Sequence, residues 1–301
     1  MLVTPTPRHW ALLGYLVLVW GLAFYLIAVA LPVFEPVTVV WGRLTLGGLV
    51  MLLLLLARKG QLPKGRRWWL RLLFLSLSGN ILPFTLIAWA EQTVPSGEVG
   101  LLMALMPITI LVLGHWFLEH EPLTVTRLAG VALGFIGVAL LLGDEVLRAG
   151  NTERLPGQLA AVAATFCYAI NGIFTKRLPP FDVVAVSAGS LCLGSIMLLG
   201  PVLITQSWVS PVAAPGPWAA VAVLGVFATG AATWVYFTIV SEVGPGFLST
   251  INYLIPALAF AAGALLLAEP VMLEHLVALV AILAGVWLIQ PRLRRKAESS
   301  R

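Results

Sequence analysis

Three asparagines lie within long apolar stretches of this chain, where polar side chains are otherwise scarce. Asn80, Asn171 and Asn252 each interrupt such a stretch, and Tyr253 directly follows Asn252. An amide or phenol inside a bilayer needs a partner within the protein or a water-filled cavity. We therefore assign all four residues to a substrate-binding site, where they would form hydrogen bonds with a solute. The alternative for the asparagines is hydrogen bonding between helices.

Two prolines occupy equivalent places in the two halves of the chain. Pro107 and Pro256 lie inside apolar stretches that are long enough to be membrane helices. A proline within a helix removes the N–H that would bind the carbonyl four residues earlier, here that of Met103 or Asn252. We expect both prolines to act as hinges and both carbonyls to face a substrate ammonium group. The alternative is a packing kink in which a nearby hydroxyl, such as that of Thr109, binds the carbonyl.

Aromatic residues could form the apolar walls of the same site. Trp20 lies too deep in its stretch to be an interface anchor, so we place it in the cavity together with Tyr168, Trp234 and Tyr253. Trp89 lies near the end of its stretch and is expected to anchor the protein at the membrane interface.

Charged residues cluster at the ends of the apolar stretches. Glu91, Gln92 and Glu98 fall in one predicted turn and are interpreted as a gate, with proton coupling through the two glutamates left open. Arg43 is the one Lys or Arg residue that lies deep within a stretch, roughly 10 Å from its end at 1.5 Å per residue. We favour a structural role for Arg43, its side chain reaching out toward Glu35. The alternative is a fixed counter-charge for a substrate carboxylate.

Several kinds of chemistry are excluded by what the sequence lacks. It contains no H-E-x-x-H, G-x-S-x-G or P-loop motif, so we predict no catalytic residues, no enzyme activity and no direct use of ATP. Its two cysteines, Cys167 and Cys192, lie in apolar stretches and are expected to be buried thiols. No metal ligand set and no cofactor site are predicted.

The elements that position these residues are membrane helices. Sixty per cent of the 301 residues are hydrophobic and 10% are charged, whereas soluble domains have about 25% charged residues. A helix needs about 20 apolar residues to cross a bilayer. Ten stretches meet this requirement: 10–31, 36–57, 69–90, 97–118, 124–143, 157–175, 183–206, 217–240, 246–268 and 272–290.

The basic residues predict the orientation of these ten spans. Fifteen of the 18 Lys and Arg residues fall on the cytoplasmic side if both termini are cytoplasmic, as the positive-inside rule requires. The net charge of +5 is therefore attributed to membrane topology and not to a nucleic-acid partner. The expected partners are the lipid bilayer and a small-molecule substrate.

A repeat at half the chain length divides the protein. Pro107 and Pro256 are 149 residues apart, and Glu121-Pro122 recurs as Glu269-Pro270. Five spans per half place the second half in the membrane upside down relative to the first, a transporter architecture. We therefore predict an all-α membrane protein with ten transmembrane helices in two inverted five-helix repeats. The expected boundaries are a first repeat at 8–143, an external linker at 144–156, a second repeat at 157–290 and a basic cytoplasmic tail at 291–301.

Small residues predict how the fifth and tenth spans pack. Gly130 and Gly134 are four residues apart, a spacing that allows close helix approach. We expect these two spans to pack together away from the cavity. A monomer is favoured on this interpretation, and an oligomer is left open.

Short motifs in both halves resemble a known family. They are Trp20-Gly21, Trp41-Gly42-Arg43-Leu44, and the proline-containing spans that run to Glu121-Pro122 and Glu269-Pro270. The chain resembles EamA-type permeases of the drug/metabolite transporter superfamily, and most of all the bacterial exporters of aromatic and other neutral amino acids. The second half departs from the pattern at Tyr168-Ala169 and Ser190. The resemblance implies movement of metabolites, drugs or amino acids across a bacterial inner membrane.

Together these features predict a secondary transporter that works by alternating access. A cavity without net charge would suit neutral or zwitterionic solutes, most of all amino acids, and their outward gradient would make the physiological result export. One alternative is efflux of drugs or organic cations in exchange for protons. Another, from a different class, is a membrane channel or a sensory or structural protein.

Overall fold

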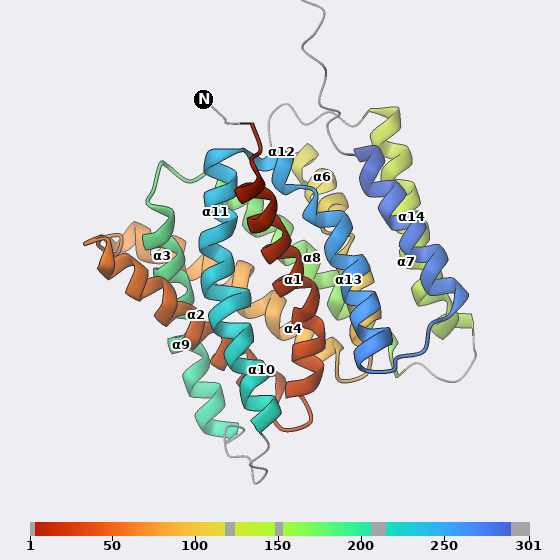
Figure 1. The fold of residues 1–301 in the computed structure, drawn as a ribbon, viewed down its shortest axis with the longest axis horizontal. Helices are drawn as coiled ribbons and strands as arrows, with labels where there is room; N and C mark the ends of the chain where they lie inside the picture. The colour runs from red at the N-terminus through yellow and green to blue at the C-terminus, as the bar shows by residue number, and fades with distance from the viewer. Residues whose placement is uncertain (1–3, 118–123, 148–152, 206–214, 290–301) are drawn as a thin grey trace, which may run out of the picture.

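The computed structural model describes residues 4–117, 124–147, 153–205 and 215–289, and it is helical throughout (Figure 1). The first half contains α1 (Pro7–Ala30), α2 (Pro36–Ala57), α3 (Arg66–Ser76), η1 (Leu77–Ile81), α4 (Leu82–Ala90), α5 (Ser96–Met103), α6 (Met106–Phe117) and α7 (Val125–Leu147). The second half contains α8 (Leu155–Lys176), α9 (Val183–Thr205), α10 (Pro215–Gly225), η2 (Val226–Ala231), α11 (Ala232–Glu242), α12 (Pro245–Leu248), α13 (Ile251–Leu266) and α14 (Leu273–Ile289).

These elements form ten spans. Within the described residues, nine helical segments are long and apolar enough to cross a membrane, and α14 is an apolar helix of 17 residues. The prediction of ten helices in two five-helix halves is confirmed. The predicted tail at 291–301, the Glu121-Pro122 turn and part of the linker at 144–156 lie outside the described residues.

Two spans contain a π-helical segment, which the sequence analysis did not anticipate. The third span is α3–η1–α4 and the eighth is α10–η2–α11. Leu77, the first residue of η1, lies 149 residues before Val226, the first residue of η2, so the two segments are repeat equivalents. A π-helical segment widens the helix by one residue and is often found at functional sites.

The fourth and ninth spans are also broken. The fourth is interrupted between α5 and α6, directly before Pro107, where Leu105 N–H donates to the Leu102 carbonyl at 3.1 Å. The ninth is interrupted between α12 and α13, where Thr250 N–H donates to Phe247 at 3.2 Å. Pro256 lies within α13, beyond the break. The first break lies within the fourth span, and the second lies one turn after the start of the ninth span, at the end of the molecule where α1 begins (Figure 1).

Equivalent helices from the two halves pair at the sides of the molecule. In Figure 1, α7 and α14 lie side by side at the right, and α2 and α9 lie at the left. The α7–α14 contact is close, since a Cβ at Gly130 would lie 2.6 Å from the Gly285 carbonyl oxygen and one at Gly285 would lie 2.9 Å from the Gly134 backbone nitrogen. The predicted packing of the fifth span against the tenth is confirmed. The other six spans occupy the centre.

The bundle has two opposite ends, which are distinguished by the elements that reach them. The terminal face is the one on which α1 begins and α14 ends, at the top of Figure 1. The distal face is the opposite one, on which α1 ends and α14 begins. Prolines at the first positions of α1 and α2, Pro7 and Pro36, favour helix initiation at these faces.

Candidate functional site

A cavity of about 340 Å³ is lined by residues of the six central spans and by Arg43 of α2. Its wall includes residues of α1, η1, α4, α5, α8, η2 and α13, so both π-helical segments and both broken spans contribute to it. The irregular backbone is thus placed around a cavity, which is where a membrane protein tolerates it.

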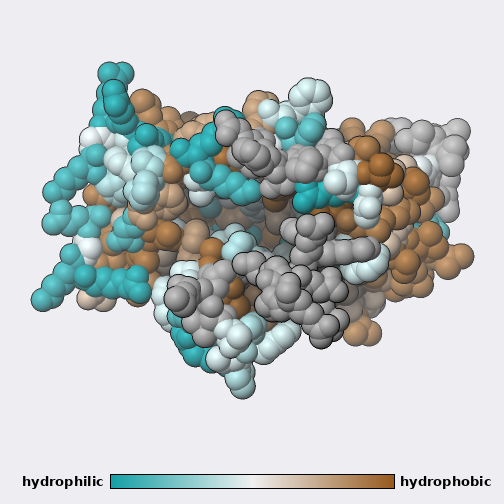
Figure 2. Space-filling view, turned by 90° about the horizontal axis from the view of Figure 1, so that it is seen from above, coloured by the Kyte–Doolittle hydropathy of each residue, from teal (hydrophilic) through white to brown (hydrophobic). Residues whose placement is uncertain are grey.

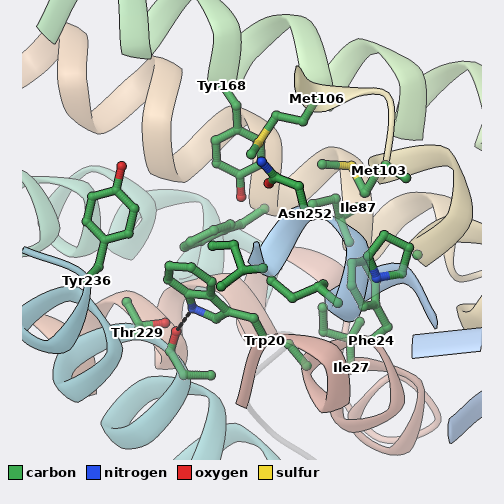
Figure 3. A pocket seen from close by; sticks show the side chains of 18 of the residues that line it. Trp20, Phe24, Ile27, Ile87, Met103, Met106, Tyr168, Thr229, Tyr236 and Asn252 are labelled. Atoms are coloured by element: carbon green, nitrogen blue, oxygen red, sulfur yellow. Dashed lines mark hydrogen bonds between the residues drawn. The ribbon is translucent and has the colours of Figure 1, made fainter. Parts of the chain in front are cut away.

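Most of the predicted site residues lie in this wall. They are Trp20, Asn80, Met103, Tyr168 and Asn252, together with the two predicted hinges Pro107 and Pro256. Figure 3 shows Trp20, Met103, Tyr168 and Asn252 around the cavity, and they come from four different spans.

Three predicted site residues lie elsewhere. Asn171 does not line the cavity, because its Nδ2 donates to Ser78 Oγ at 3.0 Å and to the Leu75 carbonyl at 3.3 Å. Asn171 thus joins α8 to the third span by hydrogen bonding between helices, which was the alternative role for the asparagines. Trp234 is 39% exposed and outside the wall, and Tyr253 is also absent from it.

Side chains of α1 bind the carbonyls of the π-helical segment η2. Trp20 Nε1 donates to the Ala228 carbonyl at 2.9 Å, and Tyr15 donates its hydroxyl to the Phe227 carbonyl at 2.9 Å. Asn171 of α8 bonds to the third span in the same way. Because α8 is the repeat equivalent of α1, this bond is the counterpart of the bonds from α1 to η2. The first helix of each half thus positions the π-helical span of the other half.

Aromatic rings cover two sides of the cavity. Trp20 lies 6.0 Å from Tyr236 between ring centroids, and Phe84 lies 6.4 Å from Tyr168. Phe84 was not predicted as a site residue, whereas Tyr236 had been considered as one of the aromatic walls. Tyr236 is two positions from the predicted Trp234, and about 200° of helical rotation separates the two side chains.

Arg43 is the cationic residue that the sequence analysis assigned to a structural role. It lies in the cavity wall with only 7% of its surface exposed. Its Nε donates to Thr229 Oγ1 at 2.7 Å, and its guanidinium carbon lies 3.8 Å from the centre of the Phe84 ring. The side chain therefore does not reach out to Glu35, and the cavity that was expected to carry no net charge has a cationic residue in its wall. Thr229 is the repeat equivalent of Asn80, a relation that could have drawn attention to it.

The three predicted gate residues differ in their surroundings. Gln92 is exposed. Glu98 is 4% exposed and accepts a hydrogen bond from Gln158 Nε2 at 2.6 Å. Both carboxyl oxygens of Glu91 are buried and find no hydrogen-bond partner among the described residues. Burial raises the pKa of the Glu91 carboxyl well above its usual value, the charge of Glu269 adds to this effect, and Arg43 opposes it.

Glu269 joins the two halves at the distal face. Its carboxylate accepts hydrogen bonds from the backbone N–H of Ser96 at 2.7 Å, the hydroxyl of Ser96 at 2.8 Å and the backbone N–H of Gly97 at 2.9 Å. A carboxylate at the first turn of a helix is favourable because it binds free N–H groups and complements the helix dipole. These bonds between Glu269, Ser96 and Gly97 form a distal lock, which holds the start of α5 against the segment between α13 and α14.

The equivalent positions at the terminal face are open. Residues 96–100 are all buried, whereas Pro245 and Gly246 in the equivalent segment are exposed. A Cβ at Gly97 would lie 3.0 Å from Glu269 Oε2, but one at its equivalent Gly246 would meet nothing within 4 Å. Figure 2, which looks onto the terminal face, shows a hollow near its middle. The start of α5 is thus packed against the other half at the distal face, whereas the equivalent Pro245 and Gly246 at the terminal face are exposed.

Sequence comparison assigns this architecture to a family. The model of the EamA-like transporter family matches residues 9–143 and 155–290. The chain belongs to this family. It is therefore a multi-pass membrane protein and a transporter, and the two matched segments correspond to its two halves.

Relatives extend over almost the whole chain. The uncharacterized transporter YvbV of Bacillus subtilis (strain 168) is 25% identical over 290 residues, covering 96% of this chain and 93% of its own length. The uncharacterized transporter YoaV of the same organism is 24% identical, covering 90% and 92%. The uncharacterized inner membrane transporter YedA of Escherichia coli (strain K12) is 23% identical, covering 82% and 79%.

A solved structure has the same fold. This crystal structure of a protein matches with a TM-score of 0.67 at 23% identity, over 94% of this chain and 96% of that one. Within the described residues, no group of three or more His, Cys, Asp or Glu side chains could hold a metal ion.

Proposed function

We propose that this transporter works by alternating access and exports small neutral or zwitterionic metabolites, most of all amino acids, across a bacterial inner membrane. The observation that carries the proposal is the difference between the two ends of the cavity. Among the described residues, Ser96 and Gly97 pack on Glu269 of the other half at the distal face, whereas the equivalent Pro245 and Gly246 are exposed at the terminal face. Two inverted repeats that exchange these arrangements would expose the cavity to each side in turn.

The cavity suits a small amphipathic solute. Its volume of about 340 Å³ lies at the lower end of the roughly 300–1,000 Å³ typical of ligand pockets. Asn80 and Asn252 supply amide groups, and Trp20, Phe84 and Tyr168 supply aromatic surface. Neither family membership nor the chemistry of this wall calls for an enzyme activity or a cofactor.

The direction of transport follows from the predicted orientation. With both termini cytoplasmic, the terminal face is the cytoplasmic one, so the described conformation is open to the cytoplasm. A solute that the cell accumulates would bind from that side. Its own gradient would then drive export without a second ion.

Transport by the purified protein in liposomes tests the proposal. A labelled neutral amino acid such as phenylalanine should equilibrate without an ion gradient, saturably, and faster with unlabelled phenylalanine on the far side. Transport that requires an imposed pH gradient would support the alternative of proton-coupled efflux. Flux that neither saturates nor responds to solute on the far side would support a channel.

A further inference from the structure

Arg43 is a buried cation with unused hydrogen-bonding capacity. A guanidinium group carries five N–H donors, and the bond from Nε to Thr229 uses one of them. Among the described residues, this is the one side-chain hydrogen bond that Arg43 makes, and no carboxylate lies within ion-pair distance of it. A buried charge is unfavourable unless a partner compensates it.

The nearby carboxylates do not supply that partner. Glu91 acts on Arg43 only through the longer-range electrostatic interaction. Glu269 is bound by Ser96 and Gly97 in the distal lock. Tyr168, the other ionisable neighbour, carries no charge at neutral pH. The missing partner is therefore best sought in the cavity that Arg43 lines.

The surroundings of Arg43 fix the geometry of an anion site. Thr229 holds Nε in place, and Phe84 covers one face of the guanidinium plane. The remaining N–H groups form the fork that matches the two oxygens of a carboxylate. Because lysine lacks this planar fork, it would be a poor replacement.

We propose that the guanidinium of Arg43 binds the carboxylate of the substrate, so that the transported solutes are amino acids or other small organic acids with an apolar or aromatic side chain. Thr229 positions the guanidinium, because its hydroxyl accepts from Arg43 Nε and donates to the Leu224 carbonyl at 2.9 Å. The inference rests on the proposed function of the cavity as the substrate path. It disfavours organic cations, which the Arg43 charge would repel. It also assigns Trp20 and Tyr168 to the apolar part of the solute, since both line the same cavity.

Competition experiments in proteoliposomes test the carboxylate requirement. Counterflow of labelled phenylalanine is measured with unlabelled phenylalanine, 3-phenylpropionate or phenylalaninamide as competitor. In the wild type, the two carboxylates should compete at least about tenfold better than the amide, a ratio that corresponds to one charge-assisted hydrogen bond. Arg43→Gln should reduce this preference to near unity, and Arg43→Lys should restore little of it.

Arg71 offers a matched control. It stacks on Trp68 at 4.8 Å, as Arg43 stacks on Phe84, but it does not line the cavity. Arg71→Gln should keep the wild-type preference. Thr229→Val, which removes the hydroxyl and keeps the shape, should lower the preference for carboxylates over the amide severalfold. This variant is the test of the inference if Arg43→Gln does not fold.

The possible outcomes separate this inference from the proposed function. If the wild type transports phenylalanine but accepts phenylalaninamide equally well, the carboxylate site is wrong and the transport function stands. An Arg43→Gln variant that keeps a tenfold preference also overturns the inference. Absence of counterflow for every solute would instead contradict the proposed function.

Discussion

Asn252 is the polar residue through which α13 enters the cavity, four positions before Pro256. Loss of one hydrogen bond to a solute costs about 1 kcal/mol, or somewhat less than tenfold in affinity. We therefore expect Asn252→Ala to raise the KM for phenylalanine about fivefold to tenfold in the liposome assay. Gln61→Ala, which removes an exposed amide outside the cavity, should transport like the wild type. Equal KM values for the two variants would remove Asn252 from the site.

The buried carboxyl of Glu91 predicts a pH-dependent stability. A carboxyl whose pKa is raised in the folded protein is held there in the protonated form. Its contribution to the free energy of unfolding is therefore present at low pH and is lost as pH rises above about 4.5 toward the raised pKa. Glu91→Gln mimics the protonated form. The Tm of this variant minus that of the wild type should therefore grow as pH increases from 4 to 8.

Glu35→Gln provides the comparison for this pH series, because Glu35 is an exposed carboxyl directly before α2 on the same face. Its Tm difference from the wild type should stay nearly constant. A Glu91→Gln difference that is also flat would mean that the Glu91 carboxyl is ionised in the folded protein.

At the residue scale, polarity within apolar stretches was a useful but incomplete guide. It led to Asn80 and Asn252, which line the cavity, and to Asn171, which binds the third span instead. The sequence cannot separate these roles, because both require an amide facing other helices. The predicted reach of Arg43 toward Glu35 was wrong, since the distance to the end of a span says nothing about a partner such as Thr229 on a distant span.

At the scale of elements, the distal lock predicts unequal effects of the same substitution at two equivalent positions. A Cβ at Gly97 would meet Glu269 Oε2 at 3.0 Å and the Phe260 backbone at 3.2 Å, whereas one at Gly246 would meet nothing within 4 Å. Overpacking costs about 1–3 kcal/mol. Gly97→Ala should therefore lower Tm by several degrees, roughly 2–4 °C per kcal/mol, and Gly246→Ala should leave it nearly unchanged. Similar Tm values would mean that the described asymmetry is not the main state in solution.

The breaks in the helices were only partly predictable. Pro107 marks the break in the fourth span, but the break in the ninth span lies at Ser249–Thr250, several residues before Pro256. No proline marks both π-helical segments. Pro83 lies just after η1, but its repeat equivalent just after η2 is Ala232. Their backbone depends on hydrogen bonds from a helix of the other half, such as that from Trp20 to Ala228, which local sequence does not encode.

At the scale of the whole molecule, composition and the internal repeat were sufficient to predict ten helices in two halves. They were sufficient because length and apolarity alone determine whether a segment spans a bilayer, and because an odd number of spans inverts the second copy. The same features leave open which end of the cavity is closed. That depends on the contacts of a few side chains, among them Glu269 and Ser96.

The orientation of the molecule gives the last prediction. Fifteen of 18 basic residues lie on one side if both termini are cytoplasmic, so the loop between α2 and α3 should face the cytoplasm and the turn after α4 should face outward. In a variant with Cys167 and Cys192 replaced by serine, Gln61→Cys and Gln92→Cys each introduce a thiol at an exposed position. An impermeant maleimide added to intact cells should label residue 92 and leave residue 61 unlabelled until the cells are opened. The reverse pattern would place the terminal face outside, and the described conformation would then be open to the exterior, so that a solute would bind from outside and import would be the favoured direction.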